Sequence, residues 1–366
     1  MLASRSGDLN AHEPRCKALR HLRFGSVLLA VAVLAAALPV RGQPIQVATV
    51  LTGLEIPWAL AFAPDGRLFI TERPGRIRVA TNGRLAAEPI AELAVTHVGE
   101  AGLMGLALDP DFGRTGHLYI CYTARRQGAS VNRVTRLTLR GSRAVDERAL
   151  LDDLPAANIH DGCRVKFGPD GKLYVTTGDA AHPQASQQPE VLSGKILRIN
   201  ADGSIPADNP FRGSPVWSLG HRNPQGLAWD AGGRLWASEH GPGAHDEINL
   251  ILPGRNYGWP EIQGGTRRAG MVAPVLHSGN DTWAPSGLAF LGDSLYVAGL
   301  RGYRLLKVTL AADGRVTGST SLLADAYGRL RDVVVGPDGA LYVATSNRDG
   351  RGVPTGDDDR VLRVVP

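Results

Sequence analysis

The sequence has few cysteines and none of the short motifs that mark several large enzyme classes. Three cysteines occur in 366 residues, and no two have the Cys-x-x-Cys spacing of a zinc ribbon, a thioredoxin-like site or a c-type haem attachment. There is no Gly-x-x-x-x-Gly-Lys-Ser/Thr loop, no Gly-x-Ser-x-Gly elbow, no Gly-x-Gly-x-x-Gly turn and no His-Glu-x-x-His pair. Nucleotide-binding, α/β-hydrolase and zinc-protease functions therefore lose their usual sequence support.

The start of the chain has the pattern of a secretory leader. A basic segment, 15–23, precedes an uncharged apolar run, 27–40, which is too short to span a membrane. We expect residues 1–42 to be a signal peptide and residues 43–366 to be one periplasmic or secreted domain without a membrane span; the alternative is an anchor that is not cleaved. The leader holds six Lys/Arg and two Asp/Glu, so the formal charge of +5 falls to near +1, and a nucleic-acid partner has little support.

One hairpin pattern occurs six times in the mature chain. The copies read WALAFAPDGRLFIT (58–71), MGLALDPDFGRTGHLYICYT (104–123), CRVKFGPDGKLYVTTG (163–178), QGLAWDAGGRLWASE (225–239), SGLAFLGDSLYVAG (286–299) and RDVVVGPDGALYVATS (331–346). Each joins a short apolar segment, a turn of the Pro-Asp-Gly kind and a second segment that opens with Leu and an aromatic residue. Asp and Gly supply the local hydrogen bonds and the positive φ that a tight reversal needs.

The spacing of these hairpins predicts an all-β fold, a six-bladed β-propeller of four-stranded antiparallel blades. The repeated leucines lie 46 to 62 residues apart, which suits one blade with insertions better than a solenoid repeat. Strand-like segments at 45–51 and 359–365 flank the repeats. We expect them to pair in one blade and close the ring, which would remove two exposed edges. The alternative is two stacked sheets of three hairpins each.

Polar residues that flank the hairpins are expected to meet at one mouth of the propeller channel. In a propeller the first hairpin strand lies nearest the channel and begins on the face where the second strand ends. The positions that fall on this face are Glu100, His160, Arg222 and Arg329 ahead of first strands, and Asp179, Gly241 and Arg301 after second strands. Singly, such a histidine is usually a turn residue and such an arginine is usually solvated. Four arginines together, with Arg331 the fourth, would repel one another unless they bind an anion.

The longest insertion, 239–265, is rich in glycine, proline and oxygen ligands. The carbonyls of Gly241 and Pro242, with Asp246, Glu247 and Tyr257 nearby, could bind calcium, which takes about six to eight oxygen ligands and accepts backbone donors. This pattern alone does not distinguish a calcium loop from an ordinary surface loop.

Five segments resemble the soluble quinoprotein sugar dehydrogenases of the glucose/sorbosone dehydrogenase family: GEAGLMGLALDPDF, HDGCRVKFGPDGKLYVTTGD, GHRNPQGLAWD, SEHGPGAHDEINLILPGRNYGWP and RLRDVVVGPDG. The likeness covers essentially the whole mature chain, including the 19-residue gap from His160 to Asp179. It implies a six-bladed propeller that holds pyrroloquinoline quinone (PQQ) and calcium over the channel. It also implies an enzyme that oxidises aldose sugars at C1 to lactones.

The resemblance implies a role for each residue that matches the family pattern. His160 corresponds to the general base, with Asp179 and Arg222 as further catalytic residues. Cofactor contacts are implied for Glu100, Arg222, Asn223, Gln225, Arg301, Arg329 and Arg331. Gly241 and Pro242 correspond to backbone ligands of the catalytic calcium, and Glu247 and Tyr257 correspond to a second, structural calcium site.

Some positions depart from the family pattern. Glu100 stands where some relatives carry Gln, which would put a negative charge beside an anionic cofactor. Cys163 replaces a small residue near His160, and it could crowd the pocket or pair with Cys121 in an oxidising compartment; the sequence does not decide between these. Insertions that form a dimer interface in certain relatives are absent. We therefore expect a monomer that accepts a range of aldoses and passes electrons to an unknown acceptor.

Two other functions stay open from the sequence. A calcium-dependent lactonase on a similar frame would need carboxylate and Asn ligands at the channel centre, where this chain places arginines. A non-catalytic propeller that binds an anion or another protein would need only the arginines, and His160 would then be incidental.

Overall fold

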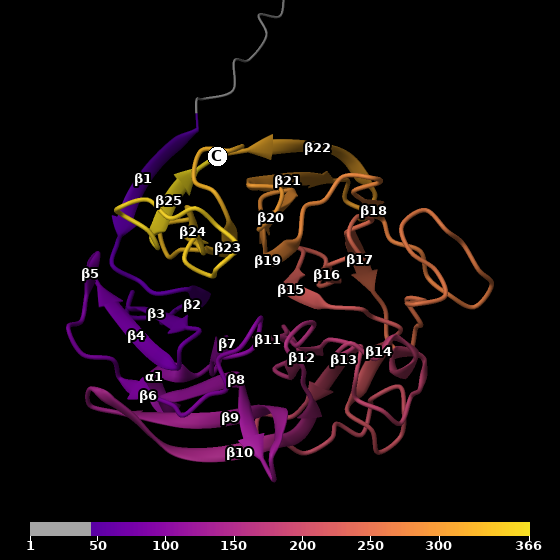
Figure 1. Ribbon diagram of the computed structural model, residues 1–366, viewed down its shortest axis with the longest axis horizontal. Helices are drawn as coiled ribbons and strands as arrows, with labels where there is room; N and C mark the ends of the chain where they lie inside the picture. The colour runs from indigo at the N-terminus through magenta and orange to yellow at the C-terminus, as the bar shows by residue number, and fades with distance from the viewer. Residues whose placement is uncertain (1–44) are drawn as a thin grey trace, which may run out of the picture. The chain divides into compact units, whose positions relative to one another are not determined.

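The computed structural model describes residues 45–366, which form six antiparallel sheets arranged in a ring around a common axis (Figure 1). This arrangement confirms the predicted six-bladed propeller and excludes two stacked sheets. The predicted leader, 1–42, lies outside the described residues. Within residues 45–366, no helix is long and apolar enough to cross a membrane.

The blades follow one another along the chain, and most consist of four consecutive strands. Blade 1 contains β2 (Pro57–Phe62), β3 (Leu68–Glu72), β4 (Arg76–Thr81), β5 (Arg84–Leu85) and β6 (Ala91–Glu92), because both short strands pair with β4. Blade 2 contains β7 (Leu103–Leu108), α1 (Phe112–Thr115), β8 (His117–Arg126), β9 (Ala129–Arg140) and β10 (Arg143–Pro155). Blade 3 contains β11 (Gly162–Phe167), β12 (Leu173–Thr177), η1 (Pro183–Gln187), β13 (Lys195–Ile199) and β14 (Val216–Leu219).

The second half of the chain builds the other three blades. Blade 4 contains β15 (Pro224–Trp229), β16 (Leu235–Glu239), β17 (Glu247–Ile251) and β18 (Leu276–His277). Blade 5 contains β19 (Pro285–Leu291), β20 (Ser294–Gly299), β21 (Arg304–Leu310) and β22 (Val316–Leu322). Blade 6 contains β23 (Leu330–Val335), β24 (Leu341–Thr345), β25 (Val361–Val365) and, as its outer strand, β1 (Gln46–Leu51).

The six predicted hairpins are the two inner strands of the six blades. In blade 3 the turn is held by Gly168 N, which donates to Lys172 O, and by Asp170 Oδ1, which accepts from Lys172 N. Gly171 has a φ of 70°, a conformation that glycine adopts without a steric penalty. The repeated leucines are each 5% exposed or less, so the pattern that identified the repeat is a core pattern.

The ring closes as predicted, because β1 pairs antiparallel with β25 and joins the two ends of the described chain in blade 6. A covalent connection lies elsewhere in the ring: Cys121 on β8 and Cys163 on β11 form a disulfide between blades 2 and 3. The structure thus decides the question that the sequence left open.

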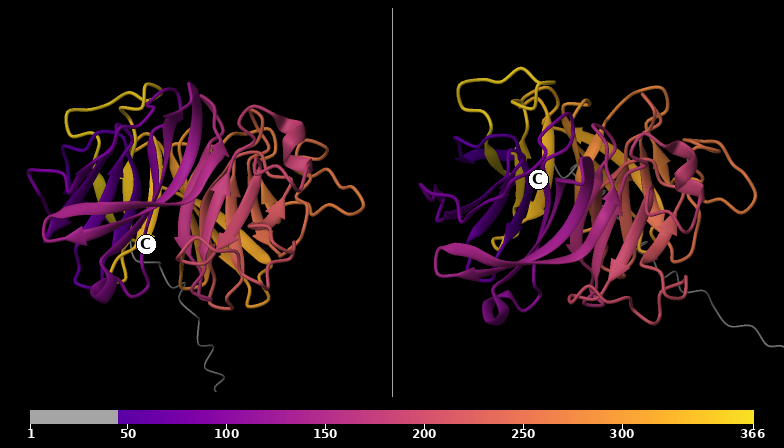
Figure 2. Two further views of the ribbon diagram at one scale, coloured as in Figure 1. Left: turned by 90° about the horizontal axis from the view of Figure 1, so that it is seen from below. Right: turned by 60° about the horizontal axis from the view of Figure 1, so that its bottom comes forward.

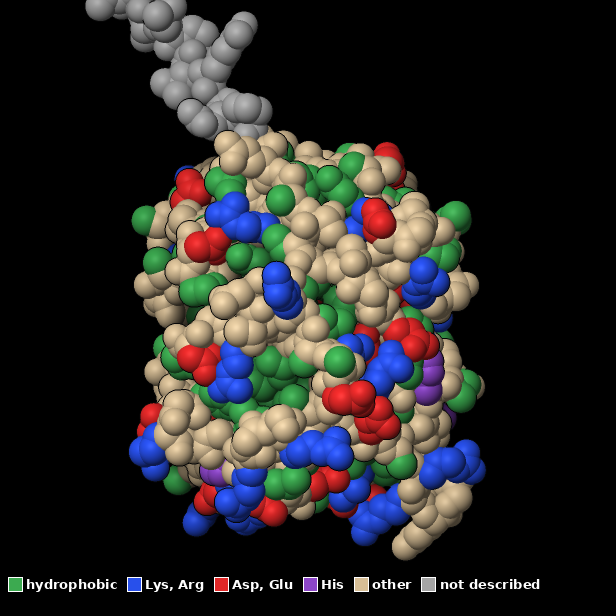
Figure 3. All heavy atoms as spheres, turned by 90° about the vertical axis from the view of Figure 1, so that its left-hand side faces the viewer, with side chains coloured by type: hydrophobic (Ala, Val, Ile, Leu, Met, Phe, Trp, Pro, Cys, Tyr) green, Lys and Arg blue, Asp and Glu red, His purple; other side chains and the backbone are tan. Residues whose placement is uncertain are grey.

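All six inner strands begin on the same face of the ring. Figure 1 shows β2, β7, β11, β15, β19 and β23 nearest the channel, and the side views in Figure 2 show η1 and α1 on opposite faces. We call the face where inner strands begin the front face. On the side of blade 1, Figure 3 shows Lys/Arg and Asp/Glu side chains interspersed rather than gathered by sign.

A buried ion pair crosses the channel between opposite blades. Arg164 Nη1 on β11 lies 3.1 Å from Asp332 Oδ1 on β23, and both side chains are almost fully buried. Asp332 Oδ2 accepts from Leu60 N on β2, and the Arg164 guanidinium lies over the Trp58 ring at 4.2 Å. The pair therefore ties blade 3 to blades 1 and 6, near the point of ring closure.

Replacing Asp332 with Asn should lower the free energy of unfolding by about 3–5 kcal/mol, because the Arg164 charge would stay buried without its partner. The double variant Arg164→Met with Asp332→Leu should recover most of that loss, since it removes both charges. Denaturant unfolding of the cofactor-free protein measures both values. Asp338→Asn, which breaks an exposed pair with Arg363 on the same blade, is the control and should change little. If Asp332→Asn unfolded at the same denaturant concentration as the wild type, the ion pair would not stabilise the ring.

Candidate active site

A cavity of about 400 Å³ opens on the front face, where loops from blades 2 to 6 meet. Eight of the predicted site residues line it: Glu100, His160, Arg222, Gln225, Gly241, Arg301, Arg329 and Arg331. They are far apart in the sequence, and the common starting face of the inner strands brings them together. Asp179 and Asn223 are fully buried behind this lining.

His160 and Asp179 form a hydrogen-bonded pair at the wall of the cavity. The distance from His160 Nδ1 to Asp179 Oδ1 is 2.7 Å, and Asp179 Oδ2 accepts from Trp259 Nε1 at 2.8 Å. Burial alone would raise the pKa of Asp179, but the hydrogen bonds from His160, Trp259 and the Ala181 N–H lower it below its ordinary value. An ionised carboxylate only accepts, so His160 donates from Nδ1. Its Nε2 is then free to accept a proton.

The backbone of His160 has an unusual conformation. Its φ is 59°, a region that few residues other than glycine occupy, and such strain is often found at functional sites. Two contacts hold the loop: His160 N donates to Glu100 Oε2, and Gly162 N donates to Asn223 Oδ1. Asn223 therefore positions the histidine loop rather than lining the cavity.

Glu100 is ionised and paired. Burial raises the pKa of Glu100, but the charge that His240 carries in acid, the Arg351 guanidinium and the His160 N–H together lower it below its ordinary value. Burial also lowers the pKa of His240 to about 4, so at neutral pH Arg351 is the cation that balances Glu100. Arg351 Nη1 lies 2.9 Å from Glu100 Oε1. The negative charge that departs from the family pattern thus has its own counter-ion.

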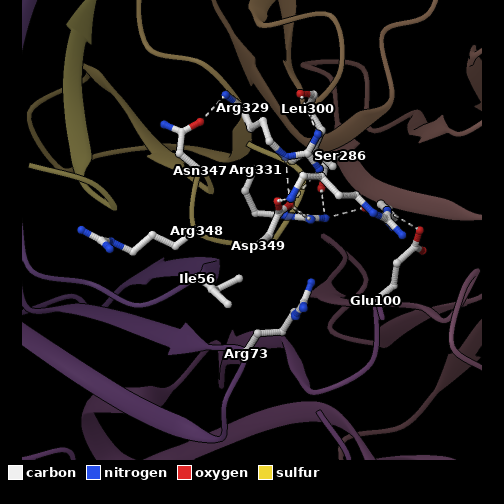
Figure 4. Close-up of polar contacts among 12 residues, drawn as sticks. Ile56, Arg73, Glu100, Ser286, Leu300, Arg329, Arg331, Asn347, Arg348 and Asp349 are labelled. Carbon is white, nitrogen blue, oxygen red and sulfur yellow. Dashed lines mark hydrogen bonds and ion pairs between the residues drawn. The ribbon is translucent and has the colours of Figure 1, made fainter. Parts of the chain in front are cut away.

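Two of the predicted arginines share a carboxylate that the sequence reasoning missed (Figure 4). Asp349 Oδ2 accepts from Arg329 Nε at 2.9 Å and from Arg329 Nη2 at 2.7 Å, and it lies 3.8 Å from Arg331 Nη2. Arg331 also donates to Gln225 Oε1 at 2.9 Å. Asp349 follows the repeated leucine by eight positions, so the six-position pattern that located Asp179 passes over it.

The guanidinium groups of the cavity have more donors than the protein satisfies. Arg222 Nε and Arg331 Nε are buried without a hydrogen-bond partner in the described chain. Arg301 is exposed at the rim, and it makes no ion pair within residues 45–366. Buried unsatisfied donors are costly, so this cavity fits a ligand that carries several acceptor oxygens. The donor set therefore suits a polycarboxylate such as PQQ.

The loop that begins at Gly241 is shaped by Asp246. Asp246 Oδ1 accepts from Gly241 N at 2.8 Å, and Oδ2 accepts from Trp283 N and Ala284 N. A Cβ atom on Gly241 would lie 2.0 Å from Ala244 O, so only glycine fits this tight loop. Within residues 45–366 no group of three or more His, Cys, Asp or Glu side chains is arranged to hold a metal. A cation in this loop would need backbone carbonyls, such as those of Gly241 and Pro242, among its ligands.

Glu247 and Tyr257 lie outside the cavity lining. Glu247 is directly opposite Glu239 on the neighbouring strand, and burial together with Glu239 raises its pKa to about 8. The Tyr257 hydroxyl donates to Leu250 O and accepts from Leu252 N, which leaves its carbonyl oxygen as the candidate metal ligand. Two carboxyl groups facing each other suit a nearby cation.

A Ser–His–Glu arrangement behind Arg222 resembles a hydrolase triad in its geometry. Ser218 Oγ lies 2.8 Å from His221 Nε2, and His221 Nδ1 lies 2.8 Å from Glu239 Oε2. Each of the three side chains is at most 5% exposed, so no substrate reaches the serine. Glu239 also accepts from Arg222 N, which indicates that the network positions Arg222.

The fold and the cavity together define a class: six-bladed propellers with an arginine-lined cavity beside a histidine–carboxylate pair. Residues 54–354 match the family described as Glucose / Sorbosone dehydrogenase, and the chain belongs to that family. It is 32% identical over 331 residues to the aldose sugar dehydrogenase YliI of Escherichia coli. The matched region covers 81% of this chain and 89% of that protein.

Two further relatives are named for the same chemistry. Quinoprotein glucose dehydrogenase B of Acinetobacter calcoaceticus is 36% identical over 249 residues, 59% of this chain and 52% of that protein. The PQQ-bound aldose sugar dehydrogenase from Streptomyces coelicolor superposes with a TM-score of 0.82 at 40% sequence identity, covering 87% of this chain and 98% of that chain.

Replacing Glu100 with Gln should make the stability of the cofactor-free protein less dependent on acidic pH. A carboxyl group with a lowered folded pKa stabilises the fold above its unfolded pKa, near 4.5, and loses that contribution as the pH falls towards the folded value. The variant should be about 1–3 kcal/mol less stable at pH ~6 and close to wild type at pH ~2.5. Denaturant titrations at both pH values measure this difference, with the exposed Glu88→Gln as control. An equal difference at both pH values would show that Glu100 is not held ionised.

Proposed function

We propose that the protein is a PQQ- and calcium-dependent dehydrogenase that oxidises aldose sugars at C1 to lactones. The observation that carries the proposal is that His160, held by Asp179, faces the same cavity as the incompletely paired arginines. The family membership and the PQQ-bound relative from Streptomyces coelicolor support it.

His160 is the proposed general base. The C1–H bond of an aldose is a poor hydride donor until the proton of the C1 hydroxyl is withdrawn, and a neutral imidazole suits this task near neutral pH. His160 Nε2 would accept that proton, while Asp179 holds Nδ1 and stabilises the imidazolium that forms. The Trp259 and Ala181 N–H groups keep Asp179 ionised and in place.

Arginines from three blades would hold the cofactor. Arg301, Arg329 and Arg331 would bind its carboxylates, and Arg222, with Gln225 beside it, would lie against the quinone carbonyls. Gly241 and Pro242 would offer carbonyl oxygens to the catalytic calcium, and Glu247 with the Tyr257 carbonyl would hold the structural one. When bound, PQQ supplies an acceptor for two electrons, and calcium supplies positive charge beside it. Arg222 would add a second positive charge at the same place.

The remaining expectations from the sequence stay predictions. These are export to the periplasm or the medium, a monomeric state, and an electron acceptor of unknown identity. The leader that underlies the first of them lies outside the described residues.

Apoprotein mixed with PQQ and calcium should reduce an artificial dye when glucose is added, and His160→Ala should lower the turnover by about a hundredfold or more. His117→Ala is a matched control, because His117 also lies beside an aspartate but sits on β8 at the other face. Steady-state kinetics at saturating PQQ measure both variants. Full turnover in His160→Ala would show that His160 is not the general base.

Replacing Arg329 or Arg331 with Ala should weaken PQQ binding by roughly tenfold or more, because each removes charged hydrogen bonds to a carboxylate. Turnover at saturating PQQ should fall less than affinity does. Titration of the apoprotein with PQQ measures the dissociation constant, and the exposed Arg363→Ala on the same blade serves as control. An unchanged titration in both variants would reject the proposed carboxylate site.

A further inference from the structure

A second cavity opens at the opposite mouth of the channel, and the proposed sugar oxidation does not use it. Its volume is about 750 Å³, within the range of small-molecule sites. All six inner strands contribute to it where they run into their turns. We call it the far-mouth cavity. The rim includes one apolar residue at or next to the end of each inner strand: Phe62, Leu108, Phe167, Trp229, Phe290 and Val335.

One position on the six inner strands, the one before the rim residue, is apolar in five blades and charged in the sixth. Lys166 occupies the strand position that the other five blades fill with small apolar residues, namely Ala61, Ala107, Ala228, Ala289 and Val334. An ammonium group among methyl groups needs a specific reason, because burying a charge is costly. Burial lowers the pKa of Lys166 to about 8, so the side chain is still a cation at neutral pH.

The lysine is held across the channel by two backbone carbonyls. Lys166 Nζ donates to Leu227 O at 3.1 Å and to Leu288 O at 3.3 Å. An ammonium has three N–H donors, so one has no acceptor in these two contacts. Lys166 belongs to the lining of the cavity, so a molecule in the cavity can contact its side chain.

The floor beside Lys166 has more positive than negative charge. Arg164 and Asp332 line the floor as the ion pair that crosses the channel. Both Asp332 oxygens are engaged, one by Arg164 and the other by Leu60 N. Arg164 Nη2 is buried and has no hydrogen-bond partner in the described chain. The other acidic residue of the lining, Asp109, follows β7 and accepts from the Tyr119 hydroxyl. It makes the formal charge of the whole lining zero, so the excess positive charge is confined to the floor.

We propose that the far-mouth cavity binds a small amphipathic monoanion, with its carboxylate or sulfonate on Lys166 and its apolar body against the aromatic rim. The floor supplies one net positive charge and unused donors, and the walls supply apolar area for a chain or ring. A sugar has no charge for this floor and too many hydroxyls for these walls. The site is independent of the sugar oxidation at the front face.

The test uses PQQ- and calcium-loaded protein, so that the front cavity is already filled. Titration with anilinonaphthalene sulfonate, followed by its fluorescence, should show saturable binding to one site. Lys166→Met should raise its dissociation constant at least about tenfold, the loss of roughly one charged hydrogen bond. Lys172→Met is the matched control, because Lys172 lies on the next turn, outside the cavity, and donates to Asn200. Its binding should match the wild type.

Two further measurements separate charge from apolar area and do not depend on the folding of Lys166→Met. Decanoate should displace the dye from the wild-type protein, while decanol, with the same chain and no charge, should displace it at least tenfold less well. Ala107→Phe, which fills the cavity without altering its charge, should abolish dye binding. Displacement by decanol as effective as by decanoate, or unchanged dye binding in Ala107→Phe, would overturn the proposal.

Discussion

Closure of the ring is the constraint on which the rest of the structure depends. β1 completes blade 6 by pairing with β25, and the Arg164–Asp332 pair connects opposite blades across the channel. A closed ring makes every inner strand begin on one face, so the loops ahead of those strands must converge. Arg351 and Glu100, 251 positions apart, form an ion pair for this reason. The topology of the ring therefore determines where the front cavity forms, whatever side chains line it.

The chemistry of that cavity comes from charges that are only partly balanced. Glu100 and Asp349 each have an arginine partner, yet Arg222 and Arg331 keep buried donors without acceptors. Charged groups with unsatisfied donors are costly in a folded protein unless a ligand completes them. A polycarboxylate would do so, and it would lie within reach of the histidine that Asp179 orients. Cofactor binding and proton transfer would then take place in the same cavity.

The sequence predicted those parts of the structure that lie at, or directly beside, equivalent positions of the six hairpins. The six hairpins follow from the repeat, the closing strands follow from the segments left over at its two ends, and the placement of His160 and Asp179 on one face follows from positions counted within one hairpin. Asp349 and Trp259 could not be found this way, because they belong to loops whose paths are set by tertiary contacts. The disulfide also required the fold, since only the fold shows that two neighbouring blades bring its cysteines together. Nothing in the sequence of β11 marks Lys166 as unusual. Only the folded ring shows that the equivalent positions of the other five blades hold Ala or Val and line the same cavity.

The central claim is that the guanidinium groups of the front cavity bind the carboxylates of PQQ. Calorimetric titration of the calcium-loaded apoprotein with PQQ and with its trimethyl ester tests it directly, because the ester keeps the quinone and loses the three negative charges. We expect the ester to bind at least about a hundredfold more weakly, as the loss of two or more charged hydrogen bonds requires. Equal affinity for the two compounds would contradict the claim.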